Sequence, residues 1–155
     1  MISFIAGIVV ILIIGIVMMP RMGRFFFVQD KSKLKFDETI EKIREACEND
    51  DKWEVIQEKN YNIAHQKKVQ GELPFRLFEF KLGNPSHAYM VNKQFPPICT
   101  FMPAAIAVVE YKNEDVIIYR KNTGLLGRMF TGNIKNIMTN EVPQQLNKIL
   151  QDVIN

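Results

Sequence analysis

The chain has 155 residues, enough for one domain and a short additional segment. Its formal net charge of +3 is mild, and no long basic run with interleaved aromatic residues is present, which argues against a dedicated nucleic-acid binder. Its two cysteines, Cys47 and Cys99, are too few for a disulfide framework. We expect two separate, mostly buried thiols, which could pair only if the fold brought them together in an oxidising compartment.

The first segment, residues 1–19, has one polar side chain, Ser3, and no charge. As a helix it would span about 28 Å, close to the hydrocarbon thickness of a bilayer. A cleaved signal peptide normally has a positive n-region and a small-residue cleavage site, which MMPRMG lacks. A buried core helix is rarely apolar on every face over this length. We therefore predict a single membrane-spanning anchor over residues 1–20, in contact with lipid.

Basic residues follow the predicted anchor rather than precede it. The positive-inside tendency then places the rest of the chain in the cytoplasm, with the periplasmic or extracellular side as the alternative. Residues 21–25 form a basic and aromatic linker, and we expect Arg21, Arg24, Phe25 and Phe26 to lie at the membrane interface. The alternative is that Phe26 and Val28 simply begin the first strand.

The remaining residues, 26–155, are expected to form one domain. We expect strands at 25–32 and 53–59, and short helices at 61–69 and 133–138. An amphipathic helix over 37–49 presents one apolar stripe, and its early acidic residues are explained by the helix dipole rather than by catalysis. A last helix over 141–153 should pack on the sheet.

The central stretch of the domain runs from Phe75 to Tyr111. Alternating apolar residues up to Leu82 predict a strand, and Gly83-Asn84-Pro85 predicts a turn with Asn84 capping a helix that runs to about Gln94. The segment 104–111 is apolar on both faces until Glu110, which is typical of a strand buried in the middle of a sheet. A hairpin turn over 112–115 leads to a strand at 116–120.

This order predicts an α+β domain in which helices cover one face of an antiparallel sheet. The segments EFKLGNPSHAYMV, FMPAAIAVVEY and FDETIEKIREAC resemble the domain-of-unknown-function family 302 over roughly Phe26 to Leu150. The resemblance implies a small domain of order β-α-β-β-β-β-α, commonly found as a homodimer, and supplies no reaction and no catalytic residues. The chain departs from many members in its predicted anchor and in its longer GLLGRMFTGN region.

Three side chains form the candidate metal site: His87, Met90 and Cys99. His87 and Met90 are three residues apart in the predicted helix and would share a face, where they could ligate a soft metal such as copper(I) or contribute to haem ligation. The alternative is a solvent-facing histidine above a core methionine. Because Cys99 and Met102 would point to opposite faces of a regular strand, at most one of them can join.

The segment NTGLLGRMFTGN is expected to be a loop. Its apolar and basic side chains, Leu125, Leu126, Arg128 and Phe130, could form a binding loop that contacts the bilayer or a partner, or could pack on the sheet. No phosphate-binding glycine motif is present, because neither Gly124 nor Gly127 is followed by Lys-Ser or Lys-Thr.

The leading functional interpretation is a membrane-anchored binding or assembly module that self-associates or docks a membrane protein complex, and we expect it not to be an enzyme. The second interpretation is a metal- or haem-handling protein that uses His87 with Met90 or Cys99. The third is an enzyme with a pocket under the loop from Gly124 to Phe130.

Overall fold

The computed structural model describes residues 23–66 and 72–154. They fold as an α+β domain with an antiparallel sheet, as predicted. The strands are β1 (Phe27–Lys31), β2 (Glu54–Asn60), β3 (Arg76–Gly83), β4 (Ala104–Glu110) and β5 (Val116–Lys121). The α-helices are α2 (Phe36–Glu48), α3 (Tyr61–Gln66), α4 (Pro85–Gln94), α5 (Thr123–Gly127), α6 (Gly132–Asn136) and α7 (Val142–Leu150). Two 3₁₀ segments, η1 (Gly23–Phe26) and η2 (Pro96–Phe101), and one π-helical segment, η3 (Ile137–Glu141), complete the order.

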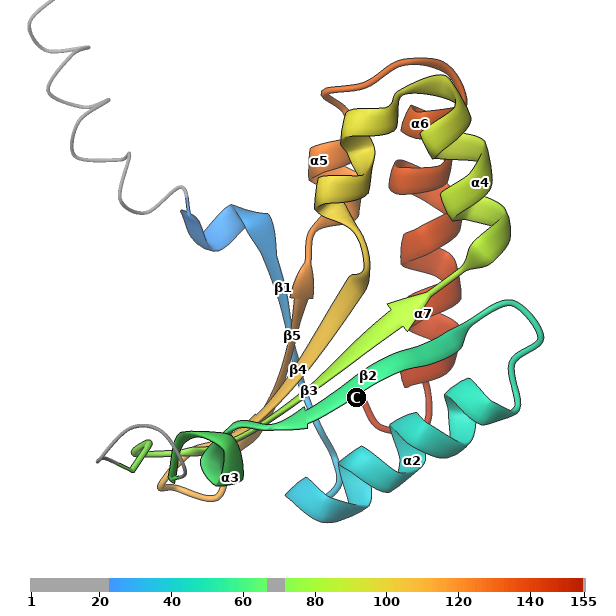
Figure 1. Ribbon diagram of the computed structural model, residues 1–155. Helices are drawn as coiled ribbons and strands as arrows, with labels where there is room; N and C mark the ends of the chain where they lie inside the picture. Colours follow the sequence, from blue (N-terminus) through green and yellow to red (C-terminus); the bar gives the residue numbers. More distant parts are fainter. Residues whose placement is uncertain (1–22, 67–71, 155) are drawn as a thin grey trace, which may run out of the picture.

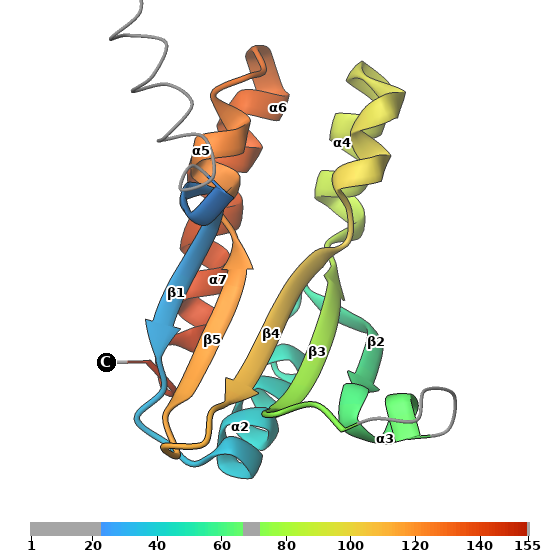
Figure 2. The same cartoon turned by 90° about the vertical axis from the view of Figure 1, so that its left-hand side faces the viewer.

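The five strands lie in the order β1-β5-β4-β3-β2, so β4 is the central strand. Figure 1 shows the sheet nearly edge-on, with α2 and α7 on the same side of it. In Figure 2 the opposite face of the sheet is turned toward the viewer, and no helix lies in front of the strands. Among residues 23–66 and 72–154, helices therefore cover one face of the sheet, as predicted, although β4 is apolar on both faces.

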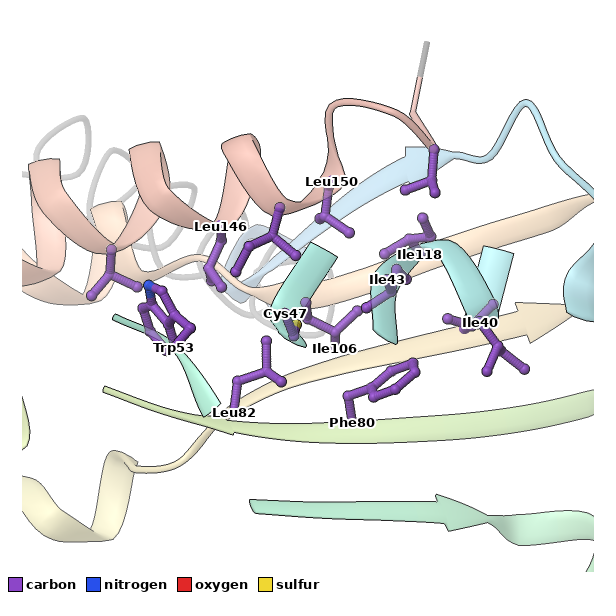
Figure 3. Close-up of a cluster of buried hydrophobic side chains, with 14 of the residues drawn as sticks. Ile40, Ile43, Cys47, Trp53, Phe80, Leu82, Ile106, Ile118, Leu146 and Leu150 are labelled. Atoms are coloured by element: carbon purple, nitrogen blue, oxygen red, sulfur yellow. The ribbon is translucent and has the colours of Figure 1, made fainter. Parts of the chain in front are cut away.

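The core lies between the covered face of the sheet and the two helices α2 and α7. Figure 3 shows Ile43 of α2 and Leu150 of α7 beside Ile106 and Ile118 of the central strands. All four side chains are fully buried. Burial of an aliphatic side chain of this size contributes about 1.5–3 kcal/mol, so this layer is the main source of the domain's stability.

The start of α4 is fixed as the sequence predicts. Asn84 caps the helix, because its Oδ1 accepts a hydrogen bond from the backbone N–H of His87 at 3.0 Å, and Pro85 occupies the first turn, where no N–H is needed. Pro96 and Pro97 then follow the last helical residue and begin η2. This local chemistry places His87 at a defined position above the end of β3.

Two predicted elements differ in the structure. The segment 122–132 contains the short helix α5, which Asn122 caps by accepting the N–H of Leu125 at 3.0 Å. It is therefore not a loop throughout. Phe25 and Phe26 lie in η1 rather than in the first strand, which begins at Phe27.

The predicted anchor, residues 1–20, lies outside the described residues, as does Arg21. Among residues 23–66 and 72–154, no helix has the length and apolar character needed to cross a bilayer.

We predict that Leu150→Ala will lower the free energy of unfolding by about 2–5 kcal/mol, since it removes a fully buried side chain between α7 and the sheet. Denaturant titration followed by circular dichroism measures the change. The matched control is Tyr89→Ala on the exposed face of α4, which should change stability by less than about 0.5 kcal/mol. Equal effects of the two substitutions would contradict the placement of the core.

Candidate ligand cavity around His87

An apolar cavity of about 320 Å³ lies between the ends of the central strands, α4, η2 and the C-terminal helices. The pairing of β4 with β5 runs from Ile106 opposite Arg120 to Glu110 opposite Val116. Ala104, Ala105 and Lys121 therefore lie outside the part in which these two strands pair. Figure 2 shows the two strands diverging at this end. The cavity occupies the space that this divergence leaves. Its lining is mostly aliphatic and aromatic, and includes Trp53, Leu82, His87, Val91, Ile98, Cys99, Met102, Ala105, Lys121, Met138, Val142 and Leu146.

Lys121 bridges the two diverging strands. Its Nζ donates to the carbonyl oxygens of Phe101 and Pro103 at 2.7 and 3.2 Å, just before β4 begins. Burial lowers the pKa of Lys121 below its ordinary value. The ammonium group thus holds the end of η2 against the end of β5, and its hydrogen bonds to the protein leave the aliphatic stem to line the cavity.

His87 lines this cavity, and one of its ring nitrogens has no hydrogen-bond partner in the described part of the chain. The residue is only 8% exposed. Its Nε2 lies 3.0 Å from Oε2 of Glu141, whereas its Nδ1 is buried and has no hydrogen-bond partner within the described part of the chain. In the neutral imidazole, a proton on Nε2 satisfies the carboxylate and leaves Nδ1 as an acceptor. A buried acceptor without a partner costs about 1–3 kcal/mol.

The π-helical segment η3 positions Glu141. The backbone N–H of Val142 bonds to the carbonyl of Ile137, five residues back, which is the π-helical pattern. Pro143 follows at once, and a proline inside a helix removes one N–H and clashes with the carbonyl four residues earlier. The widened turn accommodates this ring and directs Glu141 to His87. Asn136 fixes the other carboxylate oxygen, donating to Oε1 at 2.8 Å.

Gln145 accepts hydrogen bonds from two polar side chains of the cavity lining. Oε1 of Gln145 accepts Trp53 Nε1–H at 2.8 Å and Asn84 Nδ2–H at 3.3 Å. The rings of Trp53 and His87 meet edge-on, with centroids 6.3 Å apart. The indole N–H and one amide N–H are therefore already used, whereas Nδ1 of His87 has no partner in the described part of the chain.

The structure brings His87 and Cys99 to the same cavity but leaves Met90 outside its lining, with 38% of Met90 exposed. Met102 joins Cys99 in the lining, contrary to expectation. The expectation assumed a regular strand, whereas Cys99 lies in the 3₁₀ segment η2 and Met102 is the extended residue directly after it, so the alternation of a strand does not apply. Within residues 23–66 and 72–154, no three or more His, Cys, Asp or Glu side chains are arranged to hold a metal ion.

The two cysteines are not paired with each other. Cys47 is buried in α2, as expected, but Cys99 is exposed. Burial raises the pKa of the Cys47 thiol to about 11, helped by the nearby Asp50 carboxylate. Because the thiolate is the reactive form, Cys47 should be inert at neutral pH.

The predicted interface and the predicted binding loop lie side by side. The backbone N–H of Asn122 donates to the carbonyl of Phe26 at 2.7 Å, and the Asn122 side chain donates to the carbonyl of Phe25 at 3.1 Å. Phe25, Leu125 and Arg128 line one surface groove. Leu126 and Phe130 instead pack partly against the core. Arg24 belongs to η1 and is exposed.

Sequence reasoning missed Glu141, Trp53 and Lys121. Glu141 seemed to begin the last helix, and the only sequence signal for its role is the proline two residues later. Trp53 and Lys121 come from strand ends far apart in the chain, so only the sheet topology brings them together.

The family described as "Domain of unknown function DUF302" matches residues 28–153. The crystal structure of an uncharacterized conserved DUF302 protein from Bacillus stearothermophilus is similar, with a TM-score of 0.69 and 17% sequence identity. The likeness covers 82% of this chain and 97% of that chain, and at this identity it shows a shared fold. No curated protein matches this chain.

We predict that Ellman's reagent at pH 8 will modify Cys99 rapidly and Cys47 only when the protein unfolds, because Cys47 is buried and its pKa is raised to about 11. Absorbance should report one fast thiol in the native protein and two in denaturant. Cys99→Ser is the control and should abolish the fast phase. Two fast thiols in the native protein, or none, would contradict the described positions.

Proposed function

The chain belongs to the DUF302 family, and from that premise we propose that it is a non-enzymatic binding module whose cavity holds a small apolar molecule carrying one hydrogen-bond donor. The observation that supports this is a mostly apolar cavity whose lining includes His87, a residue with a buried Nδ1 that has no hydrogen-bond partner in the described part of the chain. Sites for small molecules typically combine apolar walls with a few placed polar groups.

The size of the cavity sets the size of the ligand. An apolar cavity of about 150 Å³ accommodates benzene. By that scale, the 320 Å³ around His87 would take a molecule of about twelve heavy atoms. An O–H or N–H group on the ligand would donate to Nδ1 and recover the cost of the unsatisfied acceptor, whereas an ether or an alkane would not.

The proposed location is a membrane, to which residues 1–20 would hold the domain on its cytoplasmic side. This part of the proposal is supported by the sequence alone: residues 1–19 carry no charge, and the basic residues follow them. A tethered domain with an apolar cavity is suited to receive a lipid-soluble molecule.

Metal or haem handling at His87 is the alternative occupant of the same cavity. It is favoured by the sulfur atoms of Cys99 and Met102, which line the cavity with the unpartnered imidazole nitrogen. A carboxylate behind the imidazole, as Glu141 provides, is also typical of a metal-bound histidine. Copper content and the absorbance spectrum of the purified full chain distinguish this alternative, since bound haem gives a Soret band.

A second candidate function is self-association through the open face of the sheet. The central strand β4 carries Ala105, Ala107 and Val109 on this face, opposite the helix-covered side. A strand that is apolar on both faces is typical of a sheet covered on both sides, and a second copy of the chain would supply the missing layer.

We predict that 1-decanol will bind the full chain in detergent and that methyl nonyl ether, its isomer without a donor, will bind at least about five-fold more weakly, since a buried acceptor left unpaired costs 1–3 kcal/mol. Trp53 lines the cavity next to His87, so its fluorescence reports binding.

His87→Phe should remove the preference for the alcohol, because the phenyl ring fills the site without an acceptor. Tyr89→Phe on the exposed face of α4 is the control and should keep the preference. Equal affinities for alcohol and ether in the native protein would refute the proposed site.

For self-association, we predict that Ala107→Arg will weaken the dimer at least about a hundred-fold, because it places like charges in a two-fold interface. Analytical ultracentrifugation of the full chain in detergent measures this. Glu48→Arg, at the exposed end of α2, is the matched control and should leave the dimer unchanged. A wild-type chain that is monomeric at all accessible concentrations would exclude this function.

A further inference from the structure

The acidic residues of this chain are absent from one end of the domain. The sequence has 17 Asp and Glu residues, but none lies in residues 80–109 or 116–140. These two stretches contain α4, η2, α5 and α6, which Figures 1 and 2 show together at one end of the molecule, beyond the diverging strands. The segregation of charge is therefore a property of the fold, because it combines two stretches that are separate in the sequence.

The cations at this end have no acidic partners. Arg24, Arg128 and Lys135 form no ion pair with any residue in the described ranges 23–66 and 72–154. Arg128 and Lys135 line the groove that also contains Phe25. Glu141 directly follows Asn140, which lines this groove, but the Glu141 carboxylate is turned to His87 and Asn136. The local field at the groove is therefore positive.

Large apolar side chains are exposed among these cations. Met129 is 75% exposed and Phe25 is 61% exposed. Phe95 and Phe101, also exposed, each lie with their ring centroid 6.2 Å from that of Phe130, so they form one aromatic cluster. Exposed apolar residues rimmed by Lys and Arg, without acidic residues, are typical of surfaces that enter the headgroup region of a membrane.

We propose that this end, formed by residues 23–26, 93–101 and 122–135 and here named the basic end, lies against an anionic bilayer and binds lipid headgroup phosphates. Arg128 and Lys135 would contact the phosphates in the groove, while Met129 and Phe25 enter the interface. The occupant is a membrane surface because the cations are accompanied by exposed aromatic side chains, which a soluble phosphate would not need.

The position of η1, the first segment that the structure describes, agrees with this orientation. The segment η1 starts at Gly23, and Asn122 holds it against the start of α5 by its two hydrogen bonds to the Phe25 and Phe26 carbonyls. The preceding residues 1–19 carry no charge in the sequence. A chain that continues into lipid from η1 would bring the basic end, rather than the β4–β5 turn, toward the bilayer.

This inference does not depend on the ligand cavity, and its test is separate. The full chain with Cys99→Ser is given a single new cysteine, either Met129→Cys at the basic end or Lys112→Cys in the β4–β5 turn. Both are labelled with the polarity-sensitive fluorophore NBD. The native Cys47 is buried and will not react. The proteins are then incorporated into vesicles of phosphatidylcholine, with or without phosphatidylglycerol.

We expect a blue shift and increased emission for the label at position 129 in phosphatidylglycerol vesicles, a smaller change in phosphatidylcholine alone, and no change for the label at position 112. High salt should reduce the effect, since the attraction is electrostatic. The double substitution Arg128→Glu with Lys135→Glu should abolish the blue shift. Loss of each cation alone should weaken binding to the anionic surface about five-fold.

Lys33→Glu with Lys112→Glu, measured with the label at position 129, is the matched control, because it changes net charge equally away from the basic end and should retain the blue shift. Circular dichroism verifies that each variant is folded. Equal emission at both label positions, no dependence on lipid charge, or an unchanged signal in the double reversal at the basic end would overturn the proposal. Binding of 1-decanol, measured on the unlabelled chain with its native Cys99, shows whether the cavity functions independently.

Discussion

The hydrogen bond between His87 Nε2 and Glu141 Oε2 is the interaction on which the candidate site depends. It uses one ring nitrogen and fixes the ring beside Trp53, while the other nitrogen is buried and has no partner among residues 23–66 and 72–154. Both residues are held by local chemistry: the Asn84 cap sets the position of His87, and the π-turn before Pro143 sets that of Glu141. Without this pair, the space between the diverging strands would be an ordinary apolar void. With it, the lining includes an imidazole whose Nδ1 has no partner in the described part of the chain.

The same divergence of strands accounts for the rest of this end of the molecule. Where β4 and β5 separate, α4 and η2 extend on one side and α5 and α6 on the other, and Lys121 bridges the separation. The cavity lies within this end and the cations lie on its surface. If both proposals hold, a lipid-soluble ligand would be close to its source, since the surface that meets the bilayer is formed by the same helices that enclose the cavity.

Much of this fold follows from local sequence. The apolar stripe of α2, the Gly83-Asn84-Pro85 turn and the alternating residues of β3 predicted elements that the structure contains. The sequence also predicted helices on one face of the sheet, and the described helices lie on one face, but they leave unexplained why β4 is apolar on both faces. His87 stood out as a rare residue type, but its role required Glu141, 54 residues later, which only the tertiary fold brings near. Met90 shares the helix of His87 yet lies outside the cavity lining, since helical spacing alone does not determine which turn meets the cavity.

The most direct measurement is the long-range ¹H–¹⁵N NMR spectrum of the histidine side chains in the full chain, with and without 1-decanol. The chain has only two histidines, so the signals are readily assigned by comparison with His87→Phe. Our account predicts that the neutral His87 ring carries its proton on Nε2, and that the Nδ1 resonance moves upfield when the alcohol donates a hydrogen bond to it. A proton on Nδ1 in the free protein, or a spectrum that does not respond to the alcohol, would contradict the proposed binding site.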